Sequence, residues 1–376
     1  MLVLIGLIIL IWLAIQTTPV QNWLVRQVTN TLSKNLHAKV RVQHVDFSLF
    51  NKMHLEGTLV EDQHNDTLLY AGNVTVNITD WFFLKDKIEL QYIGLDDAVI
   101  YLQRTDSTWN YQFLVDYFSS PQPTRKEGGI ELNLKQAAFS NVTLVQRDAW
   151  RGEDLTLQFA SLDIDAEEVS LLNKQVRINS IDIDKPFFSV YNYTGNRPRR
   201  TVVRSEPLPI INDPNNLRWN PGRWNIFVKT ITLNDGTFKN DRETERGPLD
   251  YFDGQHILFT DINGKFNNAT FQQDSIKSEI RLSTKERSGM VVKQLVANVT
   301  MHPEAMEFHN LDIQTHRSRI RDYFAMPYDS FDDMNRFVSK VRLDGNFVDA
   351  ALSSDDIAWF APALATWKKD IRLTGR

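Results

Sequence analysis

The sequence predicts a mostly β protein, built from repeated strands of an antiparallel sheet and preceded by two N-terminal helices. Three observations predict this fold. A strand pattern recurs at a fixed period, helical periodicity is rare after residue 37, and the chain opens with an unbroken apolar run. Outside the N-terminus, only residues 329–341 and 354–368 show helical spacing.

The apolar run MLVLIGLIILIWLAI occupies residues 1–15. A helix of that length reaches about 22 Å, and extension to residue 19 brings it nearer the roughly 20 residues that cross a bilayer. No basic residue precedes the run and no Ala-x-Ala site follows it, which favours an anchor over a signal peptide or a buried helix. We expect a transmembrane anchor over 1–19, with these residues in the membrane: Leu2, Leu4, Ile8, Ile11, Trp12 and Ile15.

Residues 20–38 follow with apolar side chains three and four apart, which predicts an amphipathic helix. The helix has two readings. It either caps one end of the sheet or lies along a membrane surface with Trp23 at the interface. Both readings predict the same boundaries.

The strand pattern reads apolar-x-apolar, two residues, apolar-x-apolar. Copies start at residues 40, 88, 132, 176, 226 and 306, and the middle three starts are 44 residues apart. A period of this size indicates a stacked, repetitive architecture over 39–376. Its candidate functional residues are Val40, Val42, Val45, Phe47, Ile88, Leu90, Ile93, Leu95, Leu132, Leu134, Phe139, Val176, Ile178, Ile181, Ile183, Val228, Ile231 and Leu233.

The two-residue steps have a physical meaning. Side chains alternate between the faces of a strand, so an inserted residue moves the apolar set to the other face unless a bulge restores it. We therefore expect bulges that keep one continuous apolar wall. Asn263-Gly264 predicts a hairpin turn, and residues 119–129 and 197–223 are expected to be surface excursions.

Composition narrows the function. The chain has no Cys and a formal charge of −5, which excludes disulfides and offers no basic face for nucleic acid. Motifs for catalysis or phosphate binding are missing from the sequence. Neither the spacing of His302, His309 and His316 nor Glu61, Asp62 and Asp66 makes a convincing metal site. We expect no enzyme, cofactor or metal.

A sheet with one apolar face must cover that face. A second sheet, closure into a barrel, or an open trough that accepts lipid would each do so, and composition does not choose among them. A trough needs only continuous aliphatic surface, which contributes about 0.8 kcal/mol per buried methylene.

The apolar start, the amphipathic helix and the phrases KVRVQHVDFSLFNKMHLEGTLVEDQHNDTLLYAG, DWFFLKDKIELQYIGLDDAVIYLQR and WNYQFLVDYF together resemble the N-terminal region of the TamB branch of the AsmA-like family, in its Bacteroidota form. The resemblance implies an elongated, curled antiparallel sheet, a taco-like β-groove. It also implies a single-pass anchor in a bacterial inner membrane, with the bulk of the chain in the periplasm and in a longer protein.

The same resemblance implies that phospholipids move between the inner and outer membranes along the groove. The alternative is a scaffold for outer-membrane protein translocation and assembly, with an outer-membrane barrel protein as partner. A third reading, an extracellular adhesion array, is the least favoured.

Overall fold

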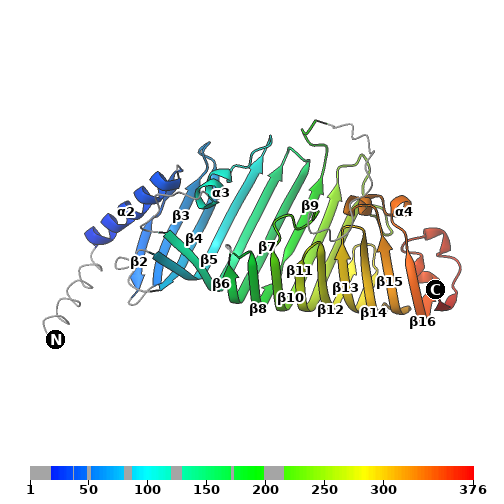
Figure 1. The fold of residues 1–376 in the computed structure, drawn as a ribbon. Coiled ribbons are helices and arrows are strands. Elements are labelled where there is room, and N and C mark those ends of the chain that lie inside the picture. The colour runs from blue at the N-terminus through cyan, green and yellow to red at the C-terminus, as the bar shows by residue number, and fades with distance from the viewer. Residues whose placement is uncertain are drawn as a thin grey trace. The chain divides into compact units, whose positions relative to one another are not determined.

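The computed structural model describes residues 18–36, 38–48, 52–79, 87–119, 129–170, 173–198 and 216–376. Within these residues, seventeen strands form one mixed sheet and helices are few (Figure 1). The predicted mostly β fold is therefore confirmed. The chain divides into unit 1, residues 1–161 and 195–197, and unit 2, residues 162–194 and 198–376. Each unit is described by itself.

The described part of unit 1 starts with a helix and continues as a sheet. Strand β3 pairs antiparallel with β1, β2 and β4, β4 pairs antiparallel with β5, and β5 pairs parallel with β6. Its elements, with β7 crossing into unit 2, are α2 (Thr18–Leu36), β1 (Val40–Arg41), β2 (His44–Ser48), β3 (Lys52–Glu61), β4 (Thr67–Thr79), β5 (Lys87–Arg104), α3 (Gln112–Ser119), β6 (Gly129–Asp148) and β7 (Glu153–Ser170).

Unit 2 places β8 and β9 end to end beside β10, both parallel to it. From β10 to β17 each strand pairs antiparallel with the next, side by side in chain order (Figure 1). Its elements are β8 (Gln175–Asp184), β9 (Phe187–Asn192), β10 (Asn225–Arg242), β11 (His256–Gln272), β12 (Ser275–Glu286), β13 (Val291–His302), β14 (Ala305–Gln314), β15 (Arg319–Pro327), η1 (Phe331–Arg336), α4 (Phe337–Lys340), β16 (Asp344–Ser353), α5 (Ser354–Ile357), η2 (Pro362–Leu364) and β17 (Asp370–Gly375).

The prediction of an all-antiparallel sheet is wrong, because β5–β6 and β8/β9–β10 are parallel pairs. A parallel pair needs a crossover of about a dozen residues or more to bring the chain back to the same end. The chain between residues 104 and 129 and the chain between residues 192 and 225 have the length for this. The two predicted surface excursions fall between the same strand ends, and residues 120–128 and 199–215 of them lie outside the described residues.

A buried aspartate outside each crossover binds residues at its start or within it. Asp148, at the end of β6, accepts two hydrogen bonds of 2.7 Å from Arg104 at the end of β5. Burial raises the pKa of Asp148, but the hydrogen bonds from Arg104 and from the Arg151 backbone outweigh burial, so the pKa falls below its usual value. In unit 2, fully buried Asp274 accepts the backbone N–H groups of residues 218, 219 and 220 in the second crossover.

The predicted amphipathic helix is confirmed as α2, two residues earlier than expected at each end. Residues 1–17, with the whole set of anchor side chains from Leu2 to Ile15, lie outside the described residues. Among the helices of the described part of the chain, none is long and apolar enough to cross a membrane.

The two-residue step in β5 is a bulge, as predicted, because the register with β4 and β6 shifts between Leu90 and Tyr92. A second insertion follows the fourth apolar position of the copies and has the backbone of a bulge as well. Asp97, Asn141, Lys185 and Asp235 each have a left-handed backbone, with φ between 48° and 52°, nine residues after a copy begins. Register shifts flank Asp235, between Leu233 and Phe238. The hairpin predicted at Asn263-Gly264 is wrong, because both residues lie inside β11. The residues that favour turns also favour left-handed bulges, and the Asn263 side chain here accepts a hydrogen bond from the Asp235 backbone.

Candidate functional site

Apolar side chains form a continuous row across seven strands of unit 2. Residues paired between neighbouring strands project to the same face of a sheet, so the strand register defines the row. This first row runs from β8 through β10 to β15 and consists of Val176, Ile226, Phe271, Ile276, Met301, Met306 and Met326. At about 4.8 Å per strand, six steps span roughly 29 Å.

Two further rows lie beside the first, and in them too apolar residues are paired from strand to strand. The second row consists of Ile181, Ile231, Phe266, Ile280 and Ala297. The third row consists of Ile183, Leu233, Gly264, Leu282, Leu295, Ile313 and Ile320. We call these three rows the apolar face of unit 2. Not one of its members carries a charge.

Among the described residues, no second layer seals the apolar face. Nearly all its side chains are half-buried, Ile276 is 39% exposed, and only Ala297 is buried. In a sandwich, a second sheet would bury such residues almost completely. Among the described residues of the whole chain, the largest fully buried side chains are Val45, Asn220, Asp148, Asp274 and Ser354, of which only Val45 is apolar. A single layer of sheet with one open apolar face explains this.

The bulge at Asp235 extends the face past the third row. After the bulge, Phe238 in β10 pairs with Phe188 in β9 on one side and with Phe259 in β11 on the other. The rings of Phe188 and Phe238 stack with centroids 5.9 Å apart. The wall that the sequence predicts therefore continues in phase through the second insertion of the pattern.

An aromatic cluster lies at the strand ends beside the first row, where β13 and β15 end. Trp219 of the crossover lies edge-on to Phe331 of η1 at 6.2 Å, and Tyr328 contacts the same ring at 6.1 Å. Burial raises the pKa of Tyr328 to about 12. Its hydroxyl donates a 2.9 Å hydrogen bond to the carbonyl of His302, at the end of β13.

Unit 1 has a corresponding row that is partly covered. Strand pairing joins neighbouring members of a row across β2 to β6, namely Val45, Leu55, Val74, Leu95 and Phe139. At the N-terminal end, Val25 of α2 packs against the cluster of Val42, Val45 and Leu55. The first copy of the repeat is therefore core, and of the two readings of α2 the cap on a sheet end is the one its contacts support. Trp23 is 61% exposed on the helix.

The predicted residues fall into three groups. Val40, Val42 and Val45 are buried core residues in unit 1, and Val228 is buried in unit 2. Phe47, Ile88, Leu90 and Leu132 lie in strands, but their side chains lie outside the described set. The remaining residues are half-buried: Ile93, Leu95, Leu134, Phe139, Val176, Ile178, Ile181, Ile183, Ile231 and Leu233.

The structure brings four of the predicted copies together in pairs. In β8 and β10, Val176 pairs with Ile226, Ile178 with Val228, Ile181 with Ile231 and Ile183 with Leu233. Both strands carry the two-residue step at the same place, so they stay in register through it. In β5 and β6, Ile93 pairs with Ala137 and Leu95 with Phe139.

Most of the apolar face in β11 to β15 was not predicted as functional. In these strands, only the copy of the strand pattern that starts at residue 306 overlaps the apolar face. These strands run antiparallel to their neighbours, so the spacing of the repeat is reversed in every second strand. Plain alternation was the available signal, for example at Ile276, Ile280 and Leu282.

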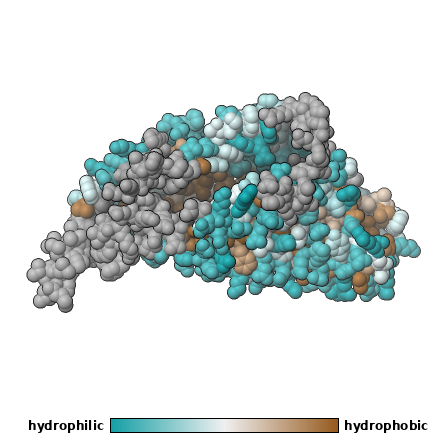
Figure 2. Space-filling view, viewed as in Figure 1, coloured by the Kyte–Doolittle hydropathy of each residue, from teal (hydrophilic) through white to brown (hydrophobic). Residues whose placement is uncertain are grey.

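The opposite face of the same strands is polar. Exposed positions alternate with the apolar rows, as at Lys265 in β11 and Arg281 in β12. Figure 2 shows a mainly hydrophilic surface over β10 to β14. The two faces of unit 2 therefore differ in chemistry along most of its length.

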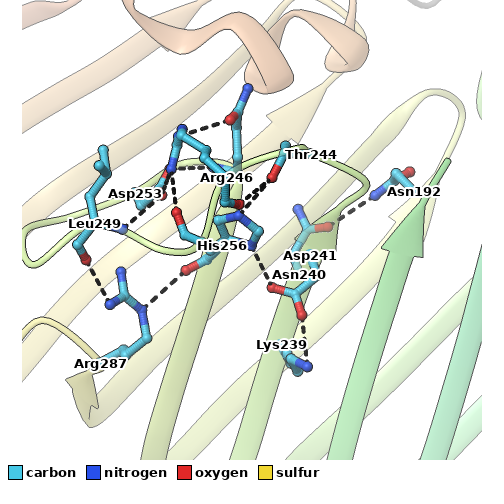
Figure 3. Close-up of polar contacts among 12 residues, drawn as sticks. Asn192, Lys239, Asn240, Asp241, Thr244, Arg246, Leu249, Asp253, His256 and Arg287 are labelled. Atoms are coloured by element: carbon cyan, nitrogen blue, oxygen red, sulfur yellow. Dashed lines mark hydrogen bonds and ion pairs between the residues drawn. The ribbon is translucent and has the colours of Figure 1, made fainter.

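A polar network holds the long β10–β11 connection (Figure 3). Arg246 makes two contacts with Asp253, at 2.6 and 3.0 Å, and Arg287 donates to the backbone carbonyls of Leu249 and Tyr251. The backbone N–H of Phe252 donates to the carbonyl of Trp359, beyond α5. The network stabilises a structured connection at this end of β10 and β11.

Within this network, Thr244, His256 and Asp241 lie in the order hydroxyl, imidazole, carboxylate. The contacts are 3.1 Å from the Thr244 hydroxyl to His256 Nε2 and 3.2 Å from Nδ1 to Asp241. Nucleophile–base–acid triads have the same order. Here, however, the hydroxyl donates its single proton to the Arg246 carbonyl at 2.8 Å. We interpret the arrangement as a structural link between the connection and the strand ends.

The weak metal candidates have structural roles. Asp62 accepts the backbone N–H groups of His64 and Asp66, at 2.8 and 3.0 Å, and so forms a turn. His309 packs against Tyr323, with ring centroids 4.9 Å apart and the planes tilted by 47°. The described residues contain no group of three or more His, Asp or Glu placed to hold a metal ion.

Comparison with known proteins does not identify a family for this chain. Neither the protein-family models nor the curated proteins contain a match to the chain.

Proposed function

We propose that this chain is part of a membrane-anchored protein of the TamB branch of the AsmA-like family, and that it moves phospholipids along its apolar face. The resemblance of its sequence phrases to that family supplies the membrane setting, with an inner-membrane anchor and a periplasmic sheet. The apolar face supplies the physical means. The sheet is then one wall of a β-groove that receives acyl chains.

One observation carries this proposal: three apolar rows continue in register from β8 to β13 or beyond without a charge, and no described residue forms a layer that covers them. Water on such a surface is unfavourable, by about 25 cal/mol per Å² of apolar area. One acyl chain spans about half of a hydrocarbon core that is about 30 Å thick. The rows span roughly 29 Å, so an acyl chain fits along them. Transfer by hydrophobic contact needs no catalytic residue.

Photo-crosslinking tests the proposal directly. p-Benzoylphenylalanine replaces Leu295, which lies in the third row, or its neighbour Val296, which projects to the other face. We expect phospholipid adducts, identified by mass spectrometry of the purified protein, at Leu295 and far fewer at Val296. Equal labelling at both positions contradicts a lipid-bearing face.

A matched pair of charge substitutions on β12 completes the test. Ile280→Asp places a carboxylate in the second row, whereas Lys277→Asp places one on an exposed position. We expect the first to reduce adducts at Leu295 several-fold and the second to leave them unchanged. Retention of a barrel-protein partner with no lipid adduct at either probe supports the assembly scaffold instead.

A further inference from the structure

We infer that unit 2 has an anion-binding site for a phosphate group, formed by polar side chains that alternate along β11 and β12 with Gly264 and Leu282 of the third row. A hollow of about 330 Å³ lies over β11, β12 and β13. Its lining combines three cations with three neutral polar side chains and no acid: Lys265, Arg281, Lys293, Asn263, Ser283 and Gln294, beside Gly264 and Leu282.

Two bulges shape the hollow. On β13 the register with β12 shifts between Leu295 and Val292, so Lys293 and Gln294 together oppose Ser283. On β11 the register with β12 shifts between Thr260 and Asn263, around left-handed Asp261. A bulge re-aims the side chains it carries. Bulges on both sides of β12 bring cations from three strands to one depression.

The cations are available for a ligand. Lys265 pairs across the strands with Arg281, so two like charges face each other. Among the described residues, no ion pair involves Lys265, Arg281 or Lys293. Arg281 donates only a long hydrogen bond, 3.4 Å, to Gln294. Like charges directly opposite are destabilising in a sheet, and an anion between them relieves that repulsion.

The nearby acids are already engaged. Asp261 pairs with Lys285 at 2.7 Å, and Glu279 accepts a hydrogen bond from Asn268 at 3.2 Å. The local excess of positive charge contrasts with the formal charge of −5 of the chain. The chain as a whole therefore repels anions, so anion binding at the hollow must come from these local cations.

The donor set fits a phosphate group better than a single carboxylate. Two ammonium groups, a planar guanidinium and the Ser283 hydroxyl surround the hollow, and a phosphate offers three strong acceptor oxygens with more charge. The phosphate has two sources: a soluble ion or the head group of an anionic lipid in a membrane surface. Exposed sites of this kind bind weakly, with a Kd on the order of 1 mM, and weaken with salt.

The test titrates the full chain with inorganic phosphate at low ionic strength by calorimetry. The site variant carries Lys265→Gln, Arg281→Gln and Lys293→Gln. A matched control carries Lys229→Gln, Lys340→Gln and Arg372→Gln, three exposed cations of unit 2 outside the hollow. We expect the site variant to bind roughly ten-fold more weakly and the control to bind like the unchanged protein. Equal losses in both variants, or no binding by the unchanged protein, overturn the site.

Vesicle flotation then identifies the source. The ligand is a head group if three results agree: phosphatidylglycerol–phosphatidylcholine vesicles bind the unchanged protein, they do not bind the site variant, and inorganic phosphate releases the unchanged protein from them. If inorganic phosphate binds at the three cations but these vesicles bind both variants equally, the ligand is a soluble phosphate. Adducts at Leu295 report the apolar face separately, so either proposal can fail alone.

Discussion

Asn141 donates a 2.6 Å side-chain hydrogen bond to the carboxylate of Asp97, 44 residues earlier. Both residues have a left-handed backbone, with φ of 51° and 52°. They occupy the same place in parallel strands β5 and β6, whose register offset beyond the shift is also 44 residues, as in the pair of Arg104 with Asp148. The sequence period thus equals the offset between two stacked copies, and the bulges of these copies bond to each other.

We expect Asn141→Val to destabilise the protein by about 1–2 kcal/mol, because a β-branched residue resists a left-handed backbone. Glycine in Asn141→Gly adopts the left-handed backbone and loses only the hydrogen bond, so the loss of folding stability is smaller, at most about 1 kcal/mol. The midpoint of urea unfolding measures both. Thr143→Val, two residues along the same strand, is the control, and a midpoint for Asn141→Val no lower than that control contradicts the role of the bulge.

Gly195→Ala should strongly disturb the contact of residues 195–197 with the turn after β6. A Cβ at Gly195 would lie 2.4 Å from backbone atoms of Arg151 and Gly152. Backbone cannot yield as a flexible side chain does, so the 2.8 Å hydrogen bond from Asn196 to the Ala149 carbonyl breaks. Hydrogen exchange of residues 149–152 measures the loss. Gly247→Ala is the control, since nothing lies within 4 Å of its Cβ, and equal exchange in both variants would refute the prediction.

Acid should release the β10–β11 connection only at low pH. Hydrogen bonds from Arg246 lower the pKa of Asp253 far below its usual value. A carboxyl group whose folded pKa is depressed stabilises the fold above its unfolded pKa, about 3.9, and this stability is lost as pH falls toward the folded pKa. Hydrogen exchange of residues 244–255, corrected for intrinsic rates, should stay constant from pH 8 to pH 5 and increase below about pH 4.

Asp253→Asn should remove this pH dependence and raise exchange at every pH, because the charged partner of Arg246 is lost. Asp250→Asn, an exposed residue of the same connection, should change neither. A transition near neutral pH in the unchanged protein would argue that another group controls the connection.

Bound lipid should protect three methionines of the first row from peroxide. Met301, Met306 and Met326 are half-buried neighbours on the apolar face, and oxidation converts a flexible apolar side chain into a polar one. We expect slower sulfoxide formation at all three when the protein is loaded with phospholipid, measured by peptide mass spectrometry. Met290, in the β12–β13 turn, serves as the reference. Equal oxidation rates with and without lipid would count against occupancy of the first row.

The strand content, the repeat and the bulges were predictable because they are local. Alternation at Ile178 to Ile183 reports the two faces of one strand, and the step between them requires a bulge whatever lies alongside. Strand direction was not predictable from such a signal. In the sequence, the crossovers look like ordinary loops. The spacing of the apolar residues around Leu95 did not show that its partner would be Phe139 and not a residue of an antiparallel hairpin.

By itself the sequence determined that this protein is a β repeat with one apolar side and an amphipathic helix before it. These properties follow from residue periodicity over a few turns or strands. Only the tertiary structure decided that α2 covers Val42 and Val45, that copies stack in parallel, and that β11 to β15 carry the apolar face onward. Such facts depend on register between residues far apart in the chain, where side-chain packing and hydrogen bonding, not local periodicity, select the partner.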